Sequence, residues 1–328
     1  MKASSSLSPS SLSLPKCTFV RILQMFLVIV WVPFAQAQVV NSRQNPLQLA
    51  IFHWDLADQA SQVSVGSMPE GIAFDGASIW VANAGSNTVS RITNGAMVSY
   101  PVASEPIGLA FDGANIWVTN LLAATVTKLR ANNGVNLGSF PVGMDPWGVV
   151  FDGANIWVTN SGVNTVTKLR ASDGMNLGVF TVGTSPYGIA FDGTNIWVAN
   201  YGSNNVTKLS QSGTTLGTFT VGNSPNGVAF DGTNIWVANE GNNTVTKLRA
   251  SDGTNLGSFS TGRHPSGVAY DGQNIWVTNY WDNTVTKLNA RSGANQGTFL
   301  AGNGPSLVAF DGANLWVTNL WGNSVSKF

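Results

Sequence analysis

Aromatic and acidic side chains of the kind that bind ligands recur at two places in this 328-residue sequence. The first place is the residue after proline in a repeated x-Pro-x-Gly motif, in which Leu replaces the glycine of the last copy. The residues at that place are Glu70, Ile107, Trp147, Tyr187, Asn226, Ser266 and Ser306. The second place follows an asparagine that ends each of seven Trp-containing segments. It includes Leu121, Leu122, Tyr201, Glu240, Tyr280, Trp281, Leu320 and Trp321.

Rings beside a few polar groups offer a large contact area at small entropic cost, which is typical of ligand-binding surfaces. We therefore predict one binding surface from both places, including the histidine that precedes one of the prolines. Its residues are Trp147, Tyr187, Tyr201, Tyr280, Trp281, Trp321, Glu240 and His264. The alternative is unconstrained variation of surface loops, which would scatter polar residues there rather than aromatic ones.

Three carboxylates flank the proline in successive copies of the motif. They are Glu70, Glu105 and Asp145. Oxygen ligands of this kind suit Ca²⁺ or Mg²⁺, so the three are candidate ligands for either ion, and no other cofactor is predicted. Turn preference and chance account for the acids as well.

Few residues suit nucleophilic catalysis. The only cysteine, Cys17, precedes an apolar run near the N-terminus, and His264 adjoins Arg263, whose charge disfavours an imidazolium. No Ser-His-Asp pattern, phosphate loop or dinucleotide motif is present. Hydrolysis by a carboxylate pair stays open, because such pairs come from distant sequence positions.

The elements that must position these residues form a repeat. Seven tryptophans lie in Ile/Leu-Trp-Val triplets at successive spacings of 37, 40, 40, 39, 40 and 40 residues. They are Trp80, Trp117, Trp157, Trp197, Trp236, Trp276 and Trp316. In the unit 148–183, four short β-branched or apolar segments alternate with turn sequences such as Asp-Gly. A period near 40 built from strands and turns is the length of a β-propeller blade.

The two ends of the repeat are complementary. The chain stops after the third strand of its seventh unit, whereas residues 61–66 match a fourth strand. We predict an all-β fold over residues 61–328: a seven-bladed β-propeller with four antiparallel strands per blade, whose last blade is closed by an N-terminal strand. An open solenoid is the alternative. In such a blade both groups of candidate residues lie on the same face.

Residues shared by all seven units are predicted to be scaffold. An Asp before Gly in each unit is expected to bond turn amides rather than to form a metal ring. The Asn that ends each Trp strand is expected to form a turn. A Lys or Arg on the third strand is expected to lay its stem along the blade with the charge in water, and the tryptophans are expected to pack between blades.

The N-terminus has the pattern of an export signal. Residues 22–34 are mostly apolar, follow three basic residues and precede Ala35-Gln36-Ala37, a signal-peptidase pattern. We predict a signal peptide over 1–37, a tether over 38–60, and a monomer that is secreted, periplasmic or held at the cell surface, without membrane insertion after cleavage. A membrane anchor is the alternative. Cleavage leaves 13 basic and 16 acidic residues, so nucleic acid is not an expected partner.

The unit Phe-Asp-Gly-Ala-Asn-Ile-Trp-Val-Thr-Asn, at residues 151–160, resembles the YVTN family of seven-bladed propellers and is similar to NHL repeats. The resemblance covers residues 61–328 and implies an exported binding protein. Streptogramin lyases have similar repeats, but theirs often end the Trp strand in Glu and use Mg²⁺ with His and Glu residues. In this chain Asn ends each Trp strand, so no lyase residue set carries over.

The sequence thus predicts a binding or scaffolding module for an extracellular peptide, protein or glycan, held on one aromatic-rich loop face. The alternative is a metal-assisted lyase or hydrolase at the mouth of the central channel.

Overall fold

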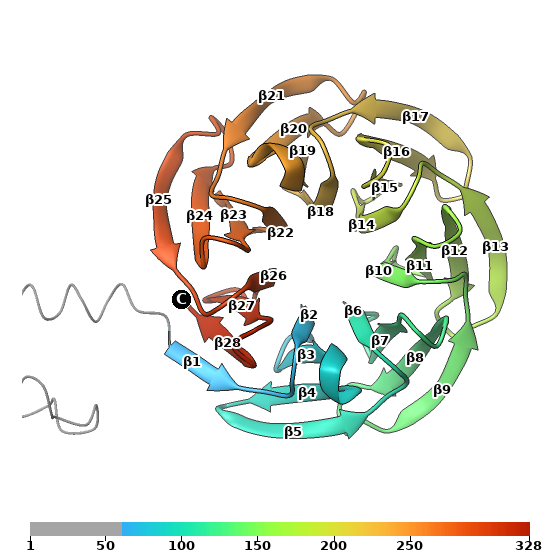
Figure 1. The fold of residues 1–328 in the computed structure, drawn as a ribbon. Helices are drawn as coiled ribbons and strands as arrows, with labels where there is room; N and C mark the ends of the chain where they lie inside the picture. The colour runs from blue at the N-terminus through green and yellow to red at the C-terminus, as the bar shows by residue number, and fades with distance from the viewer. Residues whose placement is uncertain (1–60) are drawn as a thin grey trace, which may run out of the picture. The chain divides into compact units, whose positions relative to one another are not determined.

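The computed structural model describes residues 61–328; the predicted signal peptide and tether lie outside the described residues. Strands form seven four-stranded antiparallel sheets, arranged as blades around a ring (Figure 1). The prediction of an all-β, seven-bladed β-propeller is confirmed. Within residues 61–328, no helix has the length and apolar character that crossing a membrane requires.

Each blade runs from an innermost strand to an outermost one. The innermost strands are β2 (Pro69–Phe74), β6 (Pro106–Phe111), β10 (Pro146–Phe151), β14 (Pro186–Phe191), β18 (Pro225–Phe230), β22 (Pro265–Tyr270) and β26 (Pro305–Phe310). The second strands are β3 (Ile79–Asn83), β7 (Asn115–Asn120), β11 (Asn155–Asn160), β15 (Asn195–Asn200), β19 (Asn234–Asn239), β23 (Asn274–Asn279) and β27 (Leu315–Asn319). The third strands are β4 (Thr88–Thr93), β8 (Thr125–Arg130), β12 (Thr165–Arg170), β16 (Asn205–Ser210), β20 (Thr244–Arg249), β24 (Thr284–Asn289) and β28 (Ser324–Lys327). The outermost strands are β5 (Ala96–Pro101), β9 (Asn136–Pro141), β13 (Asn176–Thr181), β17 (Thr215–Thr220), β21 (Asn255–Ser260), β25 (Asn295–Leu300) and β1 (Ser61–Ser64). Two short 3₁₀ helices, η2 (Ala84–Ser86) and η3 (Glu240–Asn242), follow β3 and β19.

The N-terminal strand closes the ring as predicted. Strand β1 pairs antiparallel with β28, from Ser61 opposite Lys327 to Ser64 opposite Ser324. Beyond the strand, the Val65 amide donates to the Asn323 carbonyl at 3.0 Å. The pairing covers an edge of β28 that would otherwise be open and joins both ends of the propeller in one sheet.

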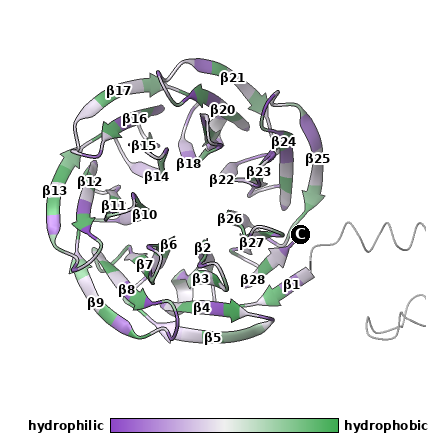
Figure 2. Ribbon diagram, turned by 180° about the vertical axis from the view of Figure 1, so that it is seen from behind, coloured by the Kyte–Doolittle hydropathy of each residue, from purple (hydrophilic) through white to green (hydrophobic). Residues whose placement is uncertain are grey.

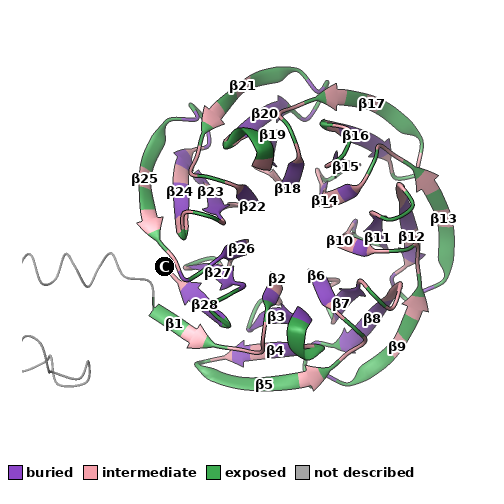
Figure 3. Ribbon diagram, viewed as in Figure 1, coloured by how far each residue is buried: buried purple, intermediate pink, exposed green. Residues whose placement is uncertain are grey.

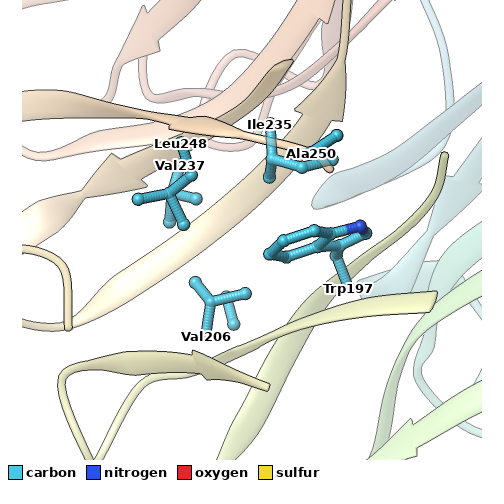
Figure 4. Packing of buried hydrophobic residues seen from close by; sticks show 7 residues of the cluster. Trp197, Val206, Ile235, Val237, Leu248 and Ala250 are labelled. Atoms are coloured by element: carbon cyan, nitrogen blue, oxygen red, sulfur yellow. The ribbon is translucent and has the colours of Figure 1, made fainter. Parts of the chain in front are cut away.

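The core lies between blades rather than inside any one of them. Trp197 and Val206 of the fourth blade pack against Ile235, Val237 and Leu248 of the fifth (Figure 4). Five of the seven repeat tryptophans have no exposed surface at all. Outermost strands are mostly exposed, the second and third strands are mostly buried, and the innermost strands combine buried and partly buried residues (Figure 3). Hydrophilic residues alternate with apolar ones along the outermost strands (Figure 2). Adjacent blades therefore stabilise each other through apolar burial.

The repeated Asp has the predicted turn role and a second one. Asp112 Oδ1 accepts the amides of Ala114 and Asn115, and its Oδ2 accepts the indole Nε1–H of Trp117 at 2.7 Å. Partial burial acts to raise the pKa of Asp112, but the hydrogen bonds from Trp117, Asn115 and the turn amides outweigh it and hold the pKa below its usual range. Asp112 therefore fixes the position of the Trp117 indole, which packs between blades.

The prediction for the repeated Lys is wrong at three positions, Lys128, Lys208 and Lys247, where the side chain is buried. Lys128 is buried: its Nζ lies 4.9 Å from the ring centroid of Trp117 and donates to the Ala171 carbonyl of the next blade at 2.6 Å. Lys208 and Lys247 repeat both contacts. The stem is long enough for the ammonium to reach the neighbouring blade, where a carbonyl and an indole face replace water. The lysine thus ties adjacent blades together.

Candidate functional site

Antiparallel order inside each blade places two sets of connections on one face of the ring. These are the loops from the outermost strand to the next innermost strand, and the loops from the second strand to the third. We call this the variable face. Every residue of the predicted binding surface comes from one of these two loop sets or from the first residues of an innermost strand.

Backbone hydrogen bonds hold the two loop sets against each other within each blade. The Ser161 amide donates to the Asp145 carbonyl at 3.0 Å, and the Tyr280 amide donates to the His264 carbonyl at 3.0 Å. Asp145 and His264 precede proline and have positive φ, 53° and 59°, which is a conformation that Asp and His tolerate better than most residues. This bend turns the chain so that the carbonyl meets the other loop.

The buried Asn that ends the second strand anchors the same two loops in four blades, at Asn160, Asn239, Asn279 and Asn319. Asn160 Nδ2 donates to the hydroxyls of Thr165 and Thr167, and its Oδ1 accepts the Gly143 amide at 3.0 Å. A further contact crosses between blades, where Asn243 Oδ1 accepts the His264 amide at 2.9 Å. The predicted turn role of Asn is therefore part of a wider hydrogen-bond network that joins the loops of the variable face.

The glycine of the x-Pro-x-Gly motif lets the innermost strands of neighbouring blades approach closely. A Cβ added to Gly148 would lie 2.5 Å from the carbonyl oxygen of Tyr187 in the next blade. Only a residue without a side chain fits there. Neighbouring blades are consequently close enough for Trp147 and Tyr187 to stack.

Three aromatic side chains form a continuous stack on the variable face. The Trp147 and Tyr187 rings lie 4.5 Å apart between centroids, at 8° between their planes. The Tyr187 and Tyr201 rings follow at 4.7 Å and 25°. We call this group the three-ring stack. Trp147 comes from β10, Tyr187 from β14 and Tyr201 from the loop after β15, so the third and fourth blades both contribute.

Glu240 links the three-ring stack to the next blades. Its Oε1 accepts the Tyr201 hydroxyl at 3.0 Å and lies 2.8 Å from His264 Nε2, while its Oε2 accepts Asn226 Nδ2 at 3.1 Å. The Glu240 side chain is only 11% exposed. Burial raises the pKa of Tyr201, and the negative charge of Glu240 acts in the same direction. We call Glu240 with its three donors the Glu240 network.

A second ring pair continues beyond the Glu240 network. His264 stacks on Trp281 with 4.2 Å between centroids and 18° between planes, and Tyr280 lies at 5.9 Å from the imidazole. Trp281 is 60% exposed, so one ring face is open to a ligand. Burial raises the pKa of Tyr280; the charges of Glu70 and Glu240 add to this effect and a hydrogen bond with Trp321 opposes it.

The predicted binding residues therefore come together along an arc. Trp147, Tyr187, Tyr201, Glu240, His264 and Trp281 are joined by stacking or hydrogen bonds, and Tyr280 borders them. Trp321 contributes differently: it is 55% exposed and lies over Gly304 of its own blade. Asn226 belongs to the arc although the prediction omitted it. Its position after proline, shared with Trp147 and Tyr187, was the available signal.

The three predicted metal ligands do not assemble. Among residues 61–328, no group of three or more His, Cys, Asp or Glu side chains is placed to hold a metal ion. Glu70 instead accepts a hydrogen bond of 2.6 Å from Ser306 Oγ of the adjacent blade. The predicted Glu70, Glu105 and Asp145 set is thus not a three-carboxylate centre.

Glu70 has unusual proton affinity for a carboxyl group. Burial raises its pKa to about 7; the hydrogen bond from Ser306 opposes this, and the negative charge of Glu105 adds to it. Glu70 and Glu105 are therefore close enough to repel each other.

Comparison with known proteins supports the fold. No family model matches the chain, and no curated protein matches its sequence. Among solved structures, the hydrazine synthase of Kuenenia stuttgartiensis is similar, with a TM-score of 0.72, 20% identity, and coverage of 81% of this chain and 97% of that chain.

Two lyase structures are similar to the same extent. A streptogramin B lyase has a TM-score of 0.71 and 18% identity, covering 82% of this chain and 97% of its own. The virginiamycin B lyase of Staphylococcus aureus has a TM-score of 0.72 and 18% identity, covering 82% and 98%. At these identities the likeness extends to the seven-bladed β-propeller and no further.

Proposed function

We propose that this protein is an exported β-propeller, of the YVTN or NHL-like kind, that binds an extracellular peptide, protein or glycan on its variable face. The observation that carries the proposal is the continuous arc from Trp147 to Trp281, which joins four consecutive blades. Aromatic anchors beside a few fixed polar groups are the usual composition of a ligand site. Side chains already held in place lose little entropy on binding.

The test is a thermal melt of the purified protein against glycans, peptides and divalent ions, with chelator as control. A ligand of the native state raises the midpoint at saturating concentration. We expect a rise with a peptide, a protein or a glycan that is lost in Trp281→Ala. The matched control is Leu300→Ala, because Leu300 is 65% exposed but lies on outermost strand β25. Equal loss in both variants would contradict a role for the variable face.

A lyase or hydrolase is the second candidate, and two observations favour it. A carboxylate orients the His264 imidazole, and the pKa of Glu70, about 7, suits proton transfer near neutral pH. For the metal assistance expected from the sequence, no group of three or more His, Cys, Asp or Glu ligands is present among residues 61–328. Turnover of a peptide or glycoside panel that is abolished by His264→Ala and retained in Leu300→Ala would favour this candidate over a binding module.

A further inference from the structure

Charge is distributed unequally between the two faces of the ring. The variable face carries five carboxylates: Glu70, Glu105, Asp145, Glu240 and Asp282. Arg263 is the single Lys or Arg of residues 61–328 on this face, because all the others belong to third strands or to the turns that follow them. Lys128 illustrates their direction, since its ammonium reaches the turn after β12 on the opposite face.

The one arginine of the variable face is already used. Arg263 Nε lies 2.6 Å from Asp282 Oδ1, and the Arg263 amide donates to Asp282 Oδ2 at 2.6 Å. The charges of Arg263 and Asp282 therefore neutralise each other. The other four carboxylates of this face, Glu70, Glu105, Asp145 and Glu240, have no Lys or Arg partner within residues 61–328. Those carboxylates produce a negative potential on the variable face, to which Glu70, with a pKa of about 7, contributes only part of a charge near neutral pH.

Two of these acids flank the three-ring stack. Burial raises the pKa of Tyr187, and the negative charges of Glu240 and Asp145 both add to the effect, so both carboxylates lie within electrostatic range of the stack. Glu240 is bonded to Tyr201 at one end, while Asp145 is separated from Trp147 at the other end only by Pro146. Aromatic faces also carry negative potential and attract cations; because both faces of Tyr187 are covered by stacking, the outer faces of Trp147 and Tyr201 are the ones that a cation can reach.

We infer that the ligand presents a positively charged group, the ammonium or guanidinium of a basic peptide, to the three-ring stack between Asp145 and Glu240. The inference rests on the proposed binding function and narrows its ligand class. A cation gains from the rings and the carboxylates together. An anionic ligand is repelled by the same carboxylates, and a neutral glycan covers them without neutralising any.

The experiment is isothermal titration calorimetry on the purified protein with five probes: tetra-arginine, tetra-lysine, tetra-glutamate, spermidine and chitotetraose. We expect both basic peptides to bind, with weaker affinity at 0.5 M than at 0.05 M NaCl. The reason is that salt screens exposed charges: the Debye length shortens about 3-fold over that range. Asp145→Asn and Trp147→Ala should each weaken binding by about tenfold. Asp173→Asn, a half-exposed carboxylate paired with Arg170 on the opposite face, is the matched control and should bind as the unmodified protein does.

Each outcome separates the inference from the function on which it rests. Trp147-dependent binding of chitotetraose or tetra-glutamate, without binding of the basic peptides, would overturn the cation and leave the binding function standing. Basic peptides that bind equally to Asp145→Asn and Asp173→Asn would overturn the assigned position. Binding of spermidine alone would support a positively charged ligand and overturn the inference that this ligand is a basic peptide. If none of the probes binds while another ligand passes the Trp281→Ala test above, only the cation inference fails.

Discussion

The carboxylate of Glu240 on the fifth blade lies 2.8 Å from imidazole Nε2 of His264 on the sixth. The same oxygen accepts the hydroxyl of Tyr201 from the fourth blade at 3.0 Å. One side chain therefore joins three consecutive blades at the variable face. Since Glu240 is largely shielded from water, these hydrogen bonds are stronger than they would be on an open surface.

Replacement of Glu240 by Gln tests whether this carboxylate organises the site. Gln has a similar size but no charge, and its amide group cannot accept all three donors. We expect the ligand affinity to fall about tenfold and the free energy of unfolding to fall by about 1–2 kcal/mol. Calorimetric titration and urea denaturation measure the two effects. Asp173→Asn should leave both unchanged, and an unaltered affinity in the Glu240 variant would contradict the assigned role.

The buried lysine ties should be a large part of the cohesion between blades. In Lys128→Met the Ala171 carbonyl loses its charged donor and Trp117 loses its cation, so the free energy of unfolding should fall by about 2–3 kcal/mol. Lys287→Met is the matched comparison, because Lys287 is half-buried and lies 4.9 Å from the Trp276 ring. Its loss should cost about 1 kcal/mol. Urea denaturation of both variants checks the order, and equal costs would show that the carbonyl bond contributes nothing.

Sequence reasoning reached the fold because its signals are local and repeated. The spacing of Trp80, Trp117 and their counterparts counts the blades, and the match of residues 61–66 to a fourth strand predicts the closure that β1 and β28 make. Alternation of antiparallel strands places both loop sets on one face. The contacts across blades follow less directly from the sequence, since they depend on side-chain torsions and on how closely two innermost strands approach.

The errors have the same origin. Lys128 was expected in water because nothing in its own strand shows that a carbonyl 43 residues away lies within reach. The Glu70, Glu105 and Asp145 metal set was drawn from adjacent blades, yet Glu70 is bonded to Ser306 on its other side. A usable signal was present for the lysine: Asp, Trp five residues later, and a cation eleven residues after the Trp recur in all seven units.

Acid should weaken the propeller through its repeated aspartates. Partial burial acts to raise the pKa of Asp311, but hydrogen bonds from Trp316, Asn314 and Ala313 outweigh it and lower the pKa to about 2. An Asp whose folded pKa lies below its unfolded value, about 3.9, stabilises the fold above that value and loses the effect as pH falls toward the folded pKa. Thermal melts should therefore show a midpoint that drops between about pH 4 and pH 2.

Asp311→Asn isolates one of these aspartates. The variant should melt at a lower temperature than the unmodified protein at pH 7, because Trp316 and the turn amides lose a charged acceptor. Its midpoint should then fall less steeply below pH 4. Asp173→Asn removes a charge from the same face without touching an indole, and it should reproduce the original acid slope; a shallower slope there would attribute the effect to net charge.

Glu70 should act in the opposite direction near neutral pH. Its folded pKa, about 7, lies above the ordinary value of 4.5. Between these values the folded state binds a proton that the unfolded state has lost, so stability falls as pH rises from about 4.5 to 7 and is constant above. Glu70→Gln should consequently change the free energy of unfolding more favourably at pH 8 than at pH 5, and the difference between the two changes should be up to about 3 kcal/mol. Urea denaturation across that range measures the difference.

Two neighbours of Glu70 should move this pH dependence in opposite directions. Ser306→Ala removes the hydrogen bond that favours the charged carboxylate, so the fall in stability should extend to higher pH. Glu105→Gln removes the charge that disfavours it, so the fall should end at lower pH. A general effect of altering this part of the variable face would shift both curves the same way, which would contradict Glu70 as the titrating group. Opposite shifts, absent when either change is combined with Glu70→Gln, would locate the proton on this side chain.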